Sequence, residues 1–231
     1  MDNVAVVTEE AAFREDLNRL NEVLVSELRK FAAPEVLSGN LFYEHLQKDF
    51  SAAPLTPRFE GKRRRLMEIA QHGSVFFEVG VNGGHSMLLV KSANPKLRCV
   101  GVDICKQLHP AWGRVDLYVP AAMRWLRQRF PNQMRFIVGD SQIELPRYAL
   151  SDERLPIDIL HLDGAKHTYF QDFVNIRPSL KRGAIVVLDD SHTPVVQKCI
   201  RDLLAIGAAE VHPDFPTNPG SGDLHMVMRV L

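Results

Sequence analysis

Acidic residues recur at one kind of position in this sequence, at the ends of short apolar runs. The five runs are SVFFEVG, RCVGVDI, RFIVGD, IDILHLD and AIVVLDD, and their acids are Glu78, Asp103, Asp140, Asp163 and the pair Asp189 and Asp190. One acid after a strand is usually the cap of the next helix, but Ser, Thr or Asn would serve there equally well. Acids after all five runs therefore indicate a shared site, whose ligand must be a cationic molecule, a metal ion or both.

A glycine-rich turn follows the first of these runs, in the stretch FFEVGVNGGHS at residues 76–86. Gly80, Gly83 and Gly84 allow a sharp turn and a close approach of ligand atoms to the backbone. The pyrophosphate-binding pattern G-x-G-x-x-G is absent from the stretch. Asp103 follows about 20 residues later, where an acid accepts hydrogen bonds from ribose hydroxyls. The pattern favours a nucleoside cofactor without phosphate groups.

The same apolar runs predict the elements that position these side chains. Continuous apolar runs of this length are typical of strands buried on both faces, and the helical stretches between them give right-handed βαβ units. The fold class is therefore α/β, a doubly wound, Rossmann-like, mostly parallel sheet whose carboxyl edge binds ligands. The last two apolar stretches, GAAEVHPDF and DLHMVMRVL, predict an antiparallel C-terminal hairpin joined by a turn rich in Pro, Gly and Ser.

The first 58 residues have a different pattern, which predicts helices. One apolar stripe at spacings of three and four consists of Phe13, Leu17, Leu20, Leu24, Leu28 and Phe31. A shorter helix is expected around residues 41–50, before the prolines of AAPLTPR break the pattern. We expect residues 1–58 to form a helical cap, lid or dimerisation segment, and residues 59–231 to form the ligand-binding domain.

The composition narrows the class of partner. The 231 residues include 28 Lys+Arg and 28 Asp+Glu, so the net charge is zero and no overall field attracts nucleic acid or anionic membranes. The N-terminus lacks the pattern of a signal peptide, and no apolar run approaches the ~18 residues of a membrane span. The three cysteines fit no metal or redox spacing. We expect a cytoplasmic protein that acts on a small molecule, either as a monomer or as a homodimer.

The acid and the glycine turn, taken together, resemble motif I of the class I S-adenosylmethionine-dependent methyltransferases. The resemblance extends from about residue 60 to the end of the chain and makes residues 59–231 the methyltransferase domain. It implies S-adenosylmethionine as the methyl donor. The cofactor-binding residues that it implies, together with the stretches below, are Glu78, Gly80, Gly84, Ser86, Asp103, Asp140, Ser141, Gln142 and Asp163.

Three further stretches resemble the metal-dependent O-methyltransferases of the catechol O-methyltransferase type. GDSQIELP is similar to their adenine-binding stretch, which implies contacts from Ser141 and Gln142. DILHLDGAKHTY is similar to the stretch that carries a metal-binding aspartate and, three residues on, a lysine. IVVLDDSH is similar to the strand end that completes their metal site. The resemblance implies Mg²⁺ or another divalent cation, bound by Asp163, Asp189 and Asp190.

The general base is left open between Lys166 and His167. Lys166 keeps the catechol-type spacing from Asp163 without a gap. The adjacent acids Asp189 and Asp190, where the catechol enzymes have aspartate and asparagine, look more like the sugar and macrolide O-methyltransferases, whose histidine His167 matches only after a one-residue insertion. We expect a metal-dependent O-methyltransferase with Lys166 as the base. A metal-free N- or O-methyltransferase and a non-catalytic nucleoside-binding protein are the alternatives.

Overall fold

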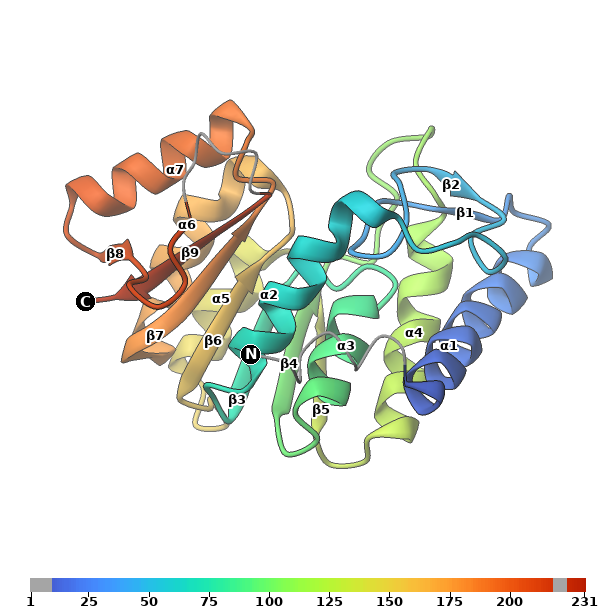
Figure 1. Ribbon diagram of the computed structural model, residues 1–231, viewed down its shortest axis with the longest axis horizontal. Helices are drawn as coiled ribbons and strands as arrows, with labels where there is room; N and C mark the ends of the chain where they lie inside the picture. The colour runs from blue at the N-terminus through green and yellow to red at the C-terminus, as the bar shows by residue number, and fades with distance from the viewer. Residues whose placement is uncertain (1–9, 218–223) are drawn as a thin grey trace. The chain divides into compact units, whose positions relative to one another are not determined.

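A computed structural model describes residues 10–217 and 224–231 and contains a seven-stranded sheet of order β5-β4-β3-β6-β7-β9-β8 (Figure 1). The strands are β3 (Val75–Val79), β4 (Arg98–Asp103), β5 (Met134–Val138), β6 (Ile157–Leu162), β7 (Leu180–Asp189), β8 (Ala209–Val211) and β9 (His225–Val230). Strand β3 pairs in parallel with β4 and β6, and β6 pairs in parallel with β7. The predicted mostly parallel sheet is confirmed.

The C-terminal hairpin is also confirmed. Strand β9, drawn in dark red in Figure 1, pairs antiparallel with both β7 and β8. Asp189 of β7 lies opposite His225 of β9 in this register. Most of the Pro-, Gly- and Ser-rich turn that joins β8 to β9 lies outside the described residues.

The chain divides into two compact units, each made of separate stretches. The first comprises the described residues up to Gln71 with Val81–Lys96 and Cys105–Phe136; the second comprises His72–Gly80, Leu97–Ile104 and Ile137–Leu231. These units do not follow the boundary at residues 58 and 59 expected from the sequence, and the role of residues 1–58 stays a prediction.

One face of the sheet in the second unit is covered by α5 (Ser141–Leu150), α6 (Tyr169–Ile176) and α7 (Pro194–Ala205). Alternate strand residues such as Phe77, Leu160 and Val186 form a continuous core with side chains from these helices. Every residue of β3 is buried, which explains its unbroken apolar run. Burial of large apolar side chains stabilises such cores by about 1.5–3 kcal/mol each.

The first unit contains α1 (Ala11–Lys30), α2 (Glu60–Ala70), α3 (His85–Ala93) and α4 (Val115–Arg129), with a short antiparallel pair of β1 (Val36–Leu37) and β2 (Gln47–Lys48). The predicted stripe of α1 is buried from Phe13 to Leu28, and α1 packs on α4 and α3. Phe31 does not belong to the stripe, because the helix ends at Lys30 and leaves the Phe31 ring 57% exposed.

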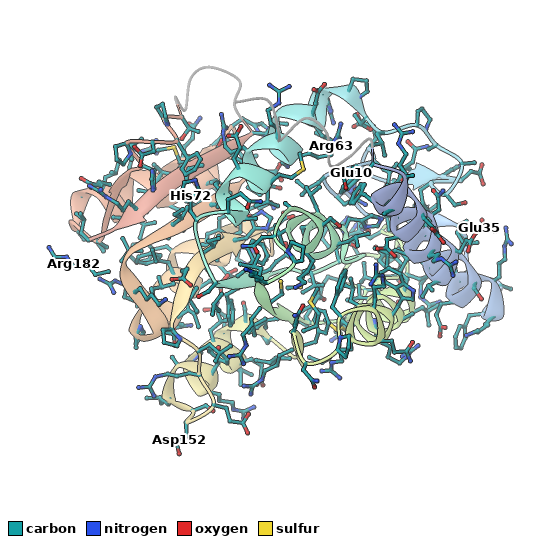
Figure 2. The ribbon with its side chains drawn as sticks, turned by 60° about the horizontal axis from the view of Figure 1, so that its bottom comes forward. Glu10, Glu35, Arg63, His72, Asp152 and Arg182 are labelled. Atoms are coloured by element: carbon teal, nitrogen blue, oxygen red, sulfur yellow. The ribbon has the colours of Figure 1, made fainter. Side chains whose placement is uncertain are left out.

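The helix expected around residues 41–50 is absent from the described structure. The side-chain oxygen of Asn40 accepts hydrogen bonds from the backbone N–H groups of Phe42 and Tyr43 and so turns the chain at the start of this stretch. Leu46 has a φ of 60°, which no α-helix accommodates. Arg63 of α2, labelled in Figure 2, donates to the backbone oxygen of Leu41 at the start of this loop and to that of Thr56 beyond it.

Among the helices formed by the described residues, none is both long and apolar enough to cross a membrane. Cys99 in β4 and Cys199 in α7 are buried, whereas Cys105, which follows β4, is half-buried.

Candidate functional site

The acidic residues singled out in the sequence lie at or near the carboxyl ends of the strands. Glu78 is the last but one residue of β3, Asp103 ends β4, and Asp189 ends β7. Asp163 follows β6 directly, and Asp190 follows β7. Asp140 is the N-cap of α5 and accepts a hydrogen bond from the backbone N–H of Gln142. All of them belong to the second unit, so its sheet edge carries a concentrated negative charge.

Three of these acids surround one ammonium group. The Nζ of Lys166 lies 2.8 Å from Asp163 Oδ1, 3.4 Å from Asp190 Oδ2 and 3.7 Å from Asp189 Oδ2. The arrangement follows from the topology, because β6 and β7 are adjacent parallel strands whose carboxyl ends must meet. The carboxylates of Asp163, Asp189 and Asp190 can therefore share a single positive charge.

This cluster is only partly open to solvent. The exposed fraction of the side chain is 25% for Lys166, 21% for Asp163 and 6% for Asp189. Burial alone would lower the pKa of Lys166, but the surrounding carboxylates outweigh it, so that the pKa lies well above its ordinary value. Lys166 is consequently a firmly held cation in this arrangement.

Two aromatic residues border the lysine cluster. The Nζ of Lys166 lies 5.3 Å from the centre of the Tyr169 ring, and burial raises the pKa of Tyr169 well above its ordinary value. On the other side, Nε2 of the buried His225 lies 3.2 Å from Asp189 Oδ1. His167, the alternative base, is exposed in the short turn before α6.

A second polar pair is buried inside the sheet. His161 of β6 lies opposite Glu78 of β3, and its Nδ1 is 2.7 Å from Glu78 Oε1. Both side chains are fully buried. Burial alone would lower the pKa of His161, but the bond to Glu78 and the nearby acids raise it. The other oxygen, Glu78 Oε2, is buried without a hydrogen bond to any described residue. Because such an orphan acceptor is unfavourable, it fits a donor supplied by a ligand.

The glycine turn has the backbone that the sequence predicts. Gly80 has a φ of 90°, and a Cβ there would lie 2.6 Å from the backbone of Asp163 and Gly164. Gly84 has a φ of 77° and is the N-cap of α3. Gly80 lies in the second unit with Glu78 and Asp163, whereas Gly84 and the buried Ser86 lie in the first.

The predicted adenine-binding stretch is held by a residue that sequence reasoning missed. Gln142 Nε2 donates to Asp172 Oδ1 at 2.6 Å, and Thr168 Oγ1 donates to Asp172 Oδ2 at 2.7 Å. Asp172 is fully buried on α6, and burial raises its pKa. The signal in the sequence was an acid on an otherwise apolar helix face, with Tyr169, Phe173 and Ile176 beside it.

The cluster around Lys166 contains the type of side chain that binds a hard metal ion. Carboxylate oxygens are the donors that Mg²⁺ prefers. Within residues 10–217 and 224–231, however, no group of three or more His, Cys, Asp or Glu side chains is arranged to hold a metal ion. In this structure the ammonium of Lys166 occupies the space between Asp163, Asp189 and Asp190, the ligands expected from the sequence.

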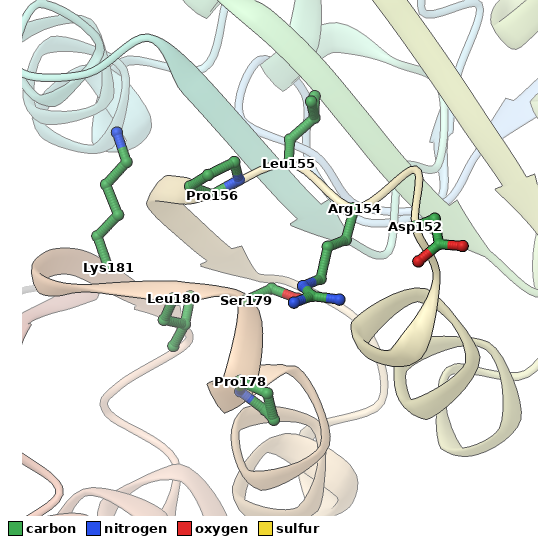
Figure 3. Close-up of a pocket in the computed structure, with 8 residues that line it drawn as sticks. All are labelled: Asp152, Arg154, Leu155, Pro156, Pro178, Ser179, Leu180 and Lys181. Carbon is green, nitrogen blue, oxygen red and sulfur yellow. The ribbon is translucent and has the colours of Figure 1, made fainter.

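A surface hollow of about 490 Å³ lies elsewhere in the second unit (Figure 3). Its lining includes Pro156, before β6, and Leu180 and Lys181, which begin β7. It therefore lies at the amino ends of these parallel strands. Ligands of doubly wound sheets bind at the opposite, carboxyl edge. We assign no cofactor to this hollow.

Solved structures with the same fold include several O-methyltransferases. A candidate caffeoyl-CoA O-methyltransferase from Staphylococcus aureus aligns with a TM-score of 0.57 and 14% identity, over 94% of this chain and 98% of its own. The O-methyltransferase TomG from Streptomyces achromogenes, solved with S-adenosylmethionine, aligns with a TM-score of 0.56 and 15% identity, over 92% of this chain and 89% of its own.

A sugar-modifying enzyme has a comparable likeness. The TDP-rhamnose 3'-O-methyltransferase of calicheamicin biosynthesis aligns with a TM-score of 0.56 and 18% identity, over 96% of this chain and 94% of its own. No curated protein sequence matches the chain significantly. Residues 77–191 match the model of a methyltransferase domain family. This match agrees with the methyltransferase resemblance of motif I, whose residues 77–86 lie at its start.

Proposed function

We propose that the protein transfers the methyl group of S-adenosylmethionine to a hydroxyl group of a small molecule, with the assistance of a divalent cation held by Asp163, Asp189 and Asp190. One observation carries the proposal: these three carboxylates, from two adjacent strand ends, already surround a single positive charge, the ammonium of Lys166. Carboxylate oxygens are also the ligands that a hard divalent cation prefers, so such a cation could take the place of the ammonium.

The cofactor is assigned to residues whose chemistry matches it. Glu78 Oε2 is a buried acceptor without a protein donor, and Gly80 has no room for a side chain. Asp103 at the end of β4 is assigned to the ribose hydroxyls, and Ser141 and Gln142 to the adenine. The bond from Gln142 to Asp172 supports the last assignment, because it fixes the amide in one orientation before the cofactor binds.

The chemistry that this site must provide is a direct displacement at the methyl carbon of a sulfonium. The acceptor oxygen has to be held in line with that carbon and made more anionic. A divalent cation at the carboxylates lowers the pKa of a hydroxyl that it binds and orients the group. Asp163, Asp189 and Asp190 would hold the cation, and Lys166, once it has lost its own proton, would accept the proton of the acceptor hydroxyl. A bound cation would take over the three carboxylates and so remove the interactions that raise the pKa of Lys166 in this structure.

Methyl transfer without a metal is the second candidate. It is favoured by the same geometry, because the ammonium of Lys166 already lies between 2.8 and 3.7 Å from all three carboxylates. In that case Lys166 supplies the positive charge at the acceptor, and His167 is the nearest candidate for a base in the sequence.

Titration with magnesium and a chelator separates the two candidates. Binding of S-adenosylhomocysteine is measured first by calorimetry, and turnover is then followed with labelled S-adenosylmethionine and a panel of catechol, phenol and sugar acceptors. We expect turnover to fall in excess chelator and to return with added Mg²⁺. Asp163→Asn should bind S-adenosylhomocysteine but lose Mg²⁺-dependent turnover. The matched control is Asp152→Asn, because Asp152 is an exposed acid that lines the hollow at the opposite edge of the sheet, and this variant should behave as wild type.

The possible results have distinct meanings. Full turnover in excess chelator would favour the metal-free candidate. Cofactor binding without transfer to any acceptor would favour the non-catalytic nucleoside-binding protein.

Partners and location follow as part of the proposal. The zero net charge supports a soluble small-molecule enzyme that binds neither nucleic acid nor membranes, and we place it in the cytoplasm. Whether it acts as a homodimer through residues 1–58 is measured directly by sedimentation.

A further inference from the structure

Two polar side chains of the glycine turn have no part in the chemistry described above. Asn82 precedes Gly83, and His85 is the first residue of α3. Both lie in the first unit, together with the stretch Ser38–Tyr43, which we call the anchor segment. The hydrogen bonds of both side chains lead to this segment, to α1 or to Tyr118 of α4, although 44 residues separate Asn82 from Ser38 in the chain.

Asn82 connects the turn to the anchor segment through its whole amide group. Its Nδ2 donates to the backbone oxygens of Ser38, at 3.0 Å, and Gly39, at 2.7 Å. Its Oδ1 accepts from the hydroxyl of Tyr118 at 2.8 Å, and that hydroxyl in turn accepts from the backbone N–H of Ser38. Asn82 also has a φ of 49°, a conformation that Asn tolerates better than most residues.

His85 makes a second connection from the other side of the glycines. Its side chain is buried, with Nε2 2.9 Å from Asn21 Oδ1 on α1 and Nδ1 3.5 Å from Asn40 Nδ2 in the anchor segment. The amide of Asn21 donates onward to the hydroxyl of Tyr43 at 2.7 Å. Because Asn21 offers an acceptor and Asn40 a donor, a neutral ring with its proton on Nε2 satisfies both.

Such a network is a specific way to hold a turn. Apolar packing alone tolerates alternative arrangements, whereas a buried network in which each group has its partner defines one. A turn of three glycines has unusual conformational freedom and loses much of it when it binds a ligand. A partner that fixes the turn in advance reduces that loss.

We infer that Asn82 and His85 are positioning residues that hold the glycine turn in its cofactor-binding conformation against the anchor segment. The inference rests on the proposed role of the glycine turn in binding S-adenosylmethionine. It makes the anchor segment a required part of cofactor binding, although the sequence of that segment resembles no cofactor motif. It also requires cofactor binding to stabilise the anchor segment in return.

The first test compares two amide variants in the first unit. Asn82→Gly removes the side chain but keeps a residue that tolerates positive φ. The matched control is Asn94→Ala, because Asn94 follows the other end of α3 and its Nδ2 donates to the backbone oxygen of Ala70 at 2.8 Å. Affinity for S-adenosylhomocysteine is measured by calorimetry and the melting temperature by calorimetric scanning. We expect Asn82→Gly to bind about 10-fold or more weakly, as the loss of three hydrogen bonds, two of them partly buried, implies, and Asn94→Ala to bind as wild type.

The second test measures the rate of amide hydrogen exchange in the anchor segment with and without S-adenosylhomocysteine. In wild type, the ligand should slow exchange across residues 38–43 and in α5. In Asn82→Gly at saturating ligand, slowing should persist in α5 and disappear from residues 38–43.

Three outcomes would overturn these ideas in different ways. Wild type that binds no S-adenosylhomocysteine removes the proposed function and the inference with it. Equal affinity of wild type and Asn82→Gly overturns the inference alone. If both variants lose affinity to the same extent, and the loss follows the drop in their melting temperatures, Asn82 contributes to stability and is not a positioning residue.

Discussion

Acidification should weaken the first unit through His85. This side chain is fully buried among Asn21, Asn40 and the aromatic rings of Phe42 and Tyr43, and burial lowers its pKa from 6.5 to about 3. An unfolded chain takes up a proton on this histidine at its ordinary pKa, whereas the folded chain does not. The stability that depends on His85 is therefore complete above the unfolded pKa and is lost as the pH falls from 6.5 toward 3.

The size of the effect follows from the two pKa values. At about pH 5, the ratio of protonated to neutral His85 in the unfolded chain is roughly 30, while His85 in the folded chain is still neutral. At 1.36 kcal/mol per pH unit, the 1.5 units between 6.5 and about pH 5 correspond to about 2 kcal/mol of lost stability. That is a large fraction of the 5–15 kcal/mol typical of a whole domain.

Urea unfolding of wild type and His85→Gln at about pH 7.5 and about pH 5 measures this quantity. Other titrating groups occur in both proteins, so their contributions cancel in the comparison. Wild type should lose about 2 kcal/mol more than the variant between the two pH values. Equal pH dependence of the two proteins would show that the His85 ring is not held neutral, and with it the assigned proton position on Nε2 would fail.

The remaining predictions concern the candidate site. Asp103→Ala should weaken S-adenosylhomocysteine binding by about 1.5–3 kcal/mol in calorimetry, as for a hydrogen bond to a charged group, and unchanged affinity would contradict its assignment to the ribose. Asp189→Asn should retain cofactor binding and lose Mg²⁺-dependent turnover in the labelled-donor assay. Lys166→Met should lower kcat about 10²–10⁴-fold if Lys166 is the base, and His167→Ala should lower it much less. The reverse ranking would move the protein toward the sugar-type enzymes.

The strands were predictable because strands buried on both faces have continuous apolar sequences. A strand covered on both faces has no polar alternation, and β3 shows this in five consecutive buried residues. The convergence of Asp163 with Asp189 was predictable for a related reason, since acids at the ends of neighbouring parallel strands must lie at the same edge. Lys166 was placed near them by its spacing of three residues.

Contacts between residues that lie far apart in the sequence could not be predicted from it. The bond between His161 and Glu78 depends on the register of β3 against β6, and the approach of His225 to Asp189 depends on an antiparallel strand from the end of the chain. The prediction of a helix over residues 41–50 was wrong for a similar reason. Their aromatic side chains suit a helix face, but Asn40 offers the backbone a competing hydrogen-bonded turn.

The three cysteines differ in burial, so a thiol reagent should label the native protein at one of them. Cys99 and Cys199 are 1% and 5% exposed, and burial raises the pKa of Cys199 to about 12, so neither presents a thiolate to a reagent at neutral pH. Cys105 is half-buried and stands two residues after Asp103 in the chain. A maleimide dye should therefore attach first at Cys105, beside the acid assigned to the ribose. Its fluorescence would then follow cofactor occupancy in solution without an engineered cysteine and without knowledge of the methyl acceptor.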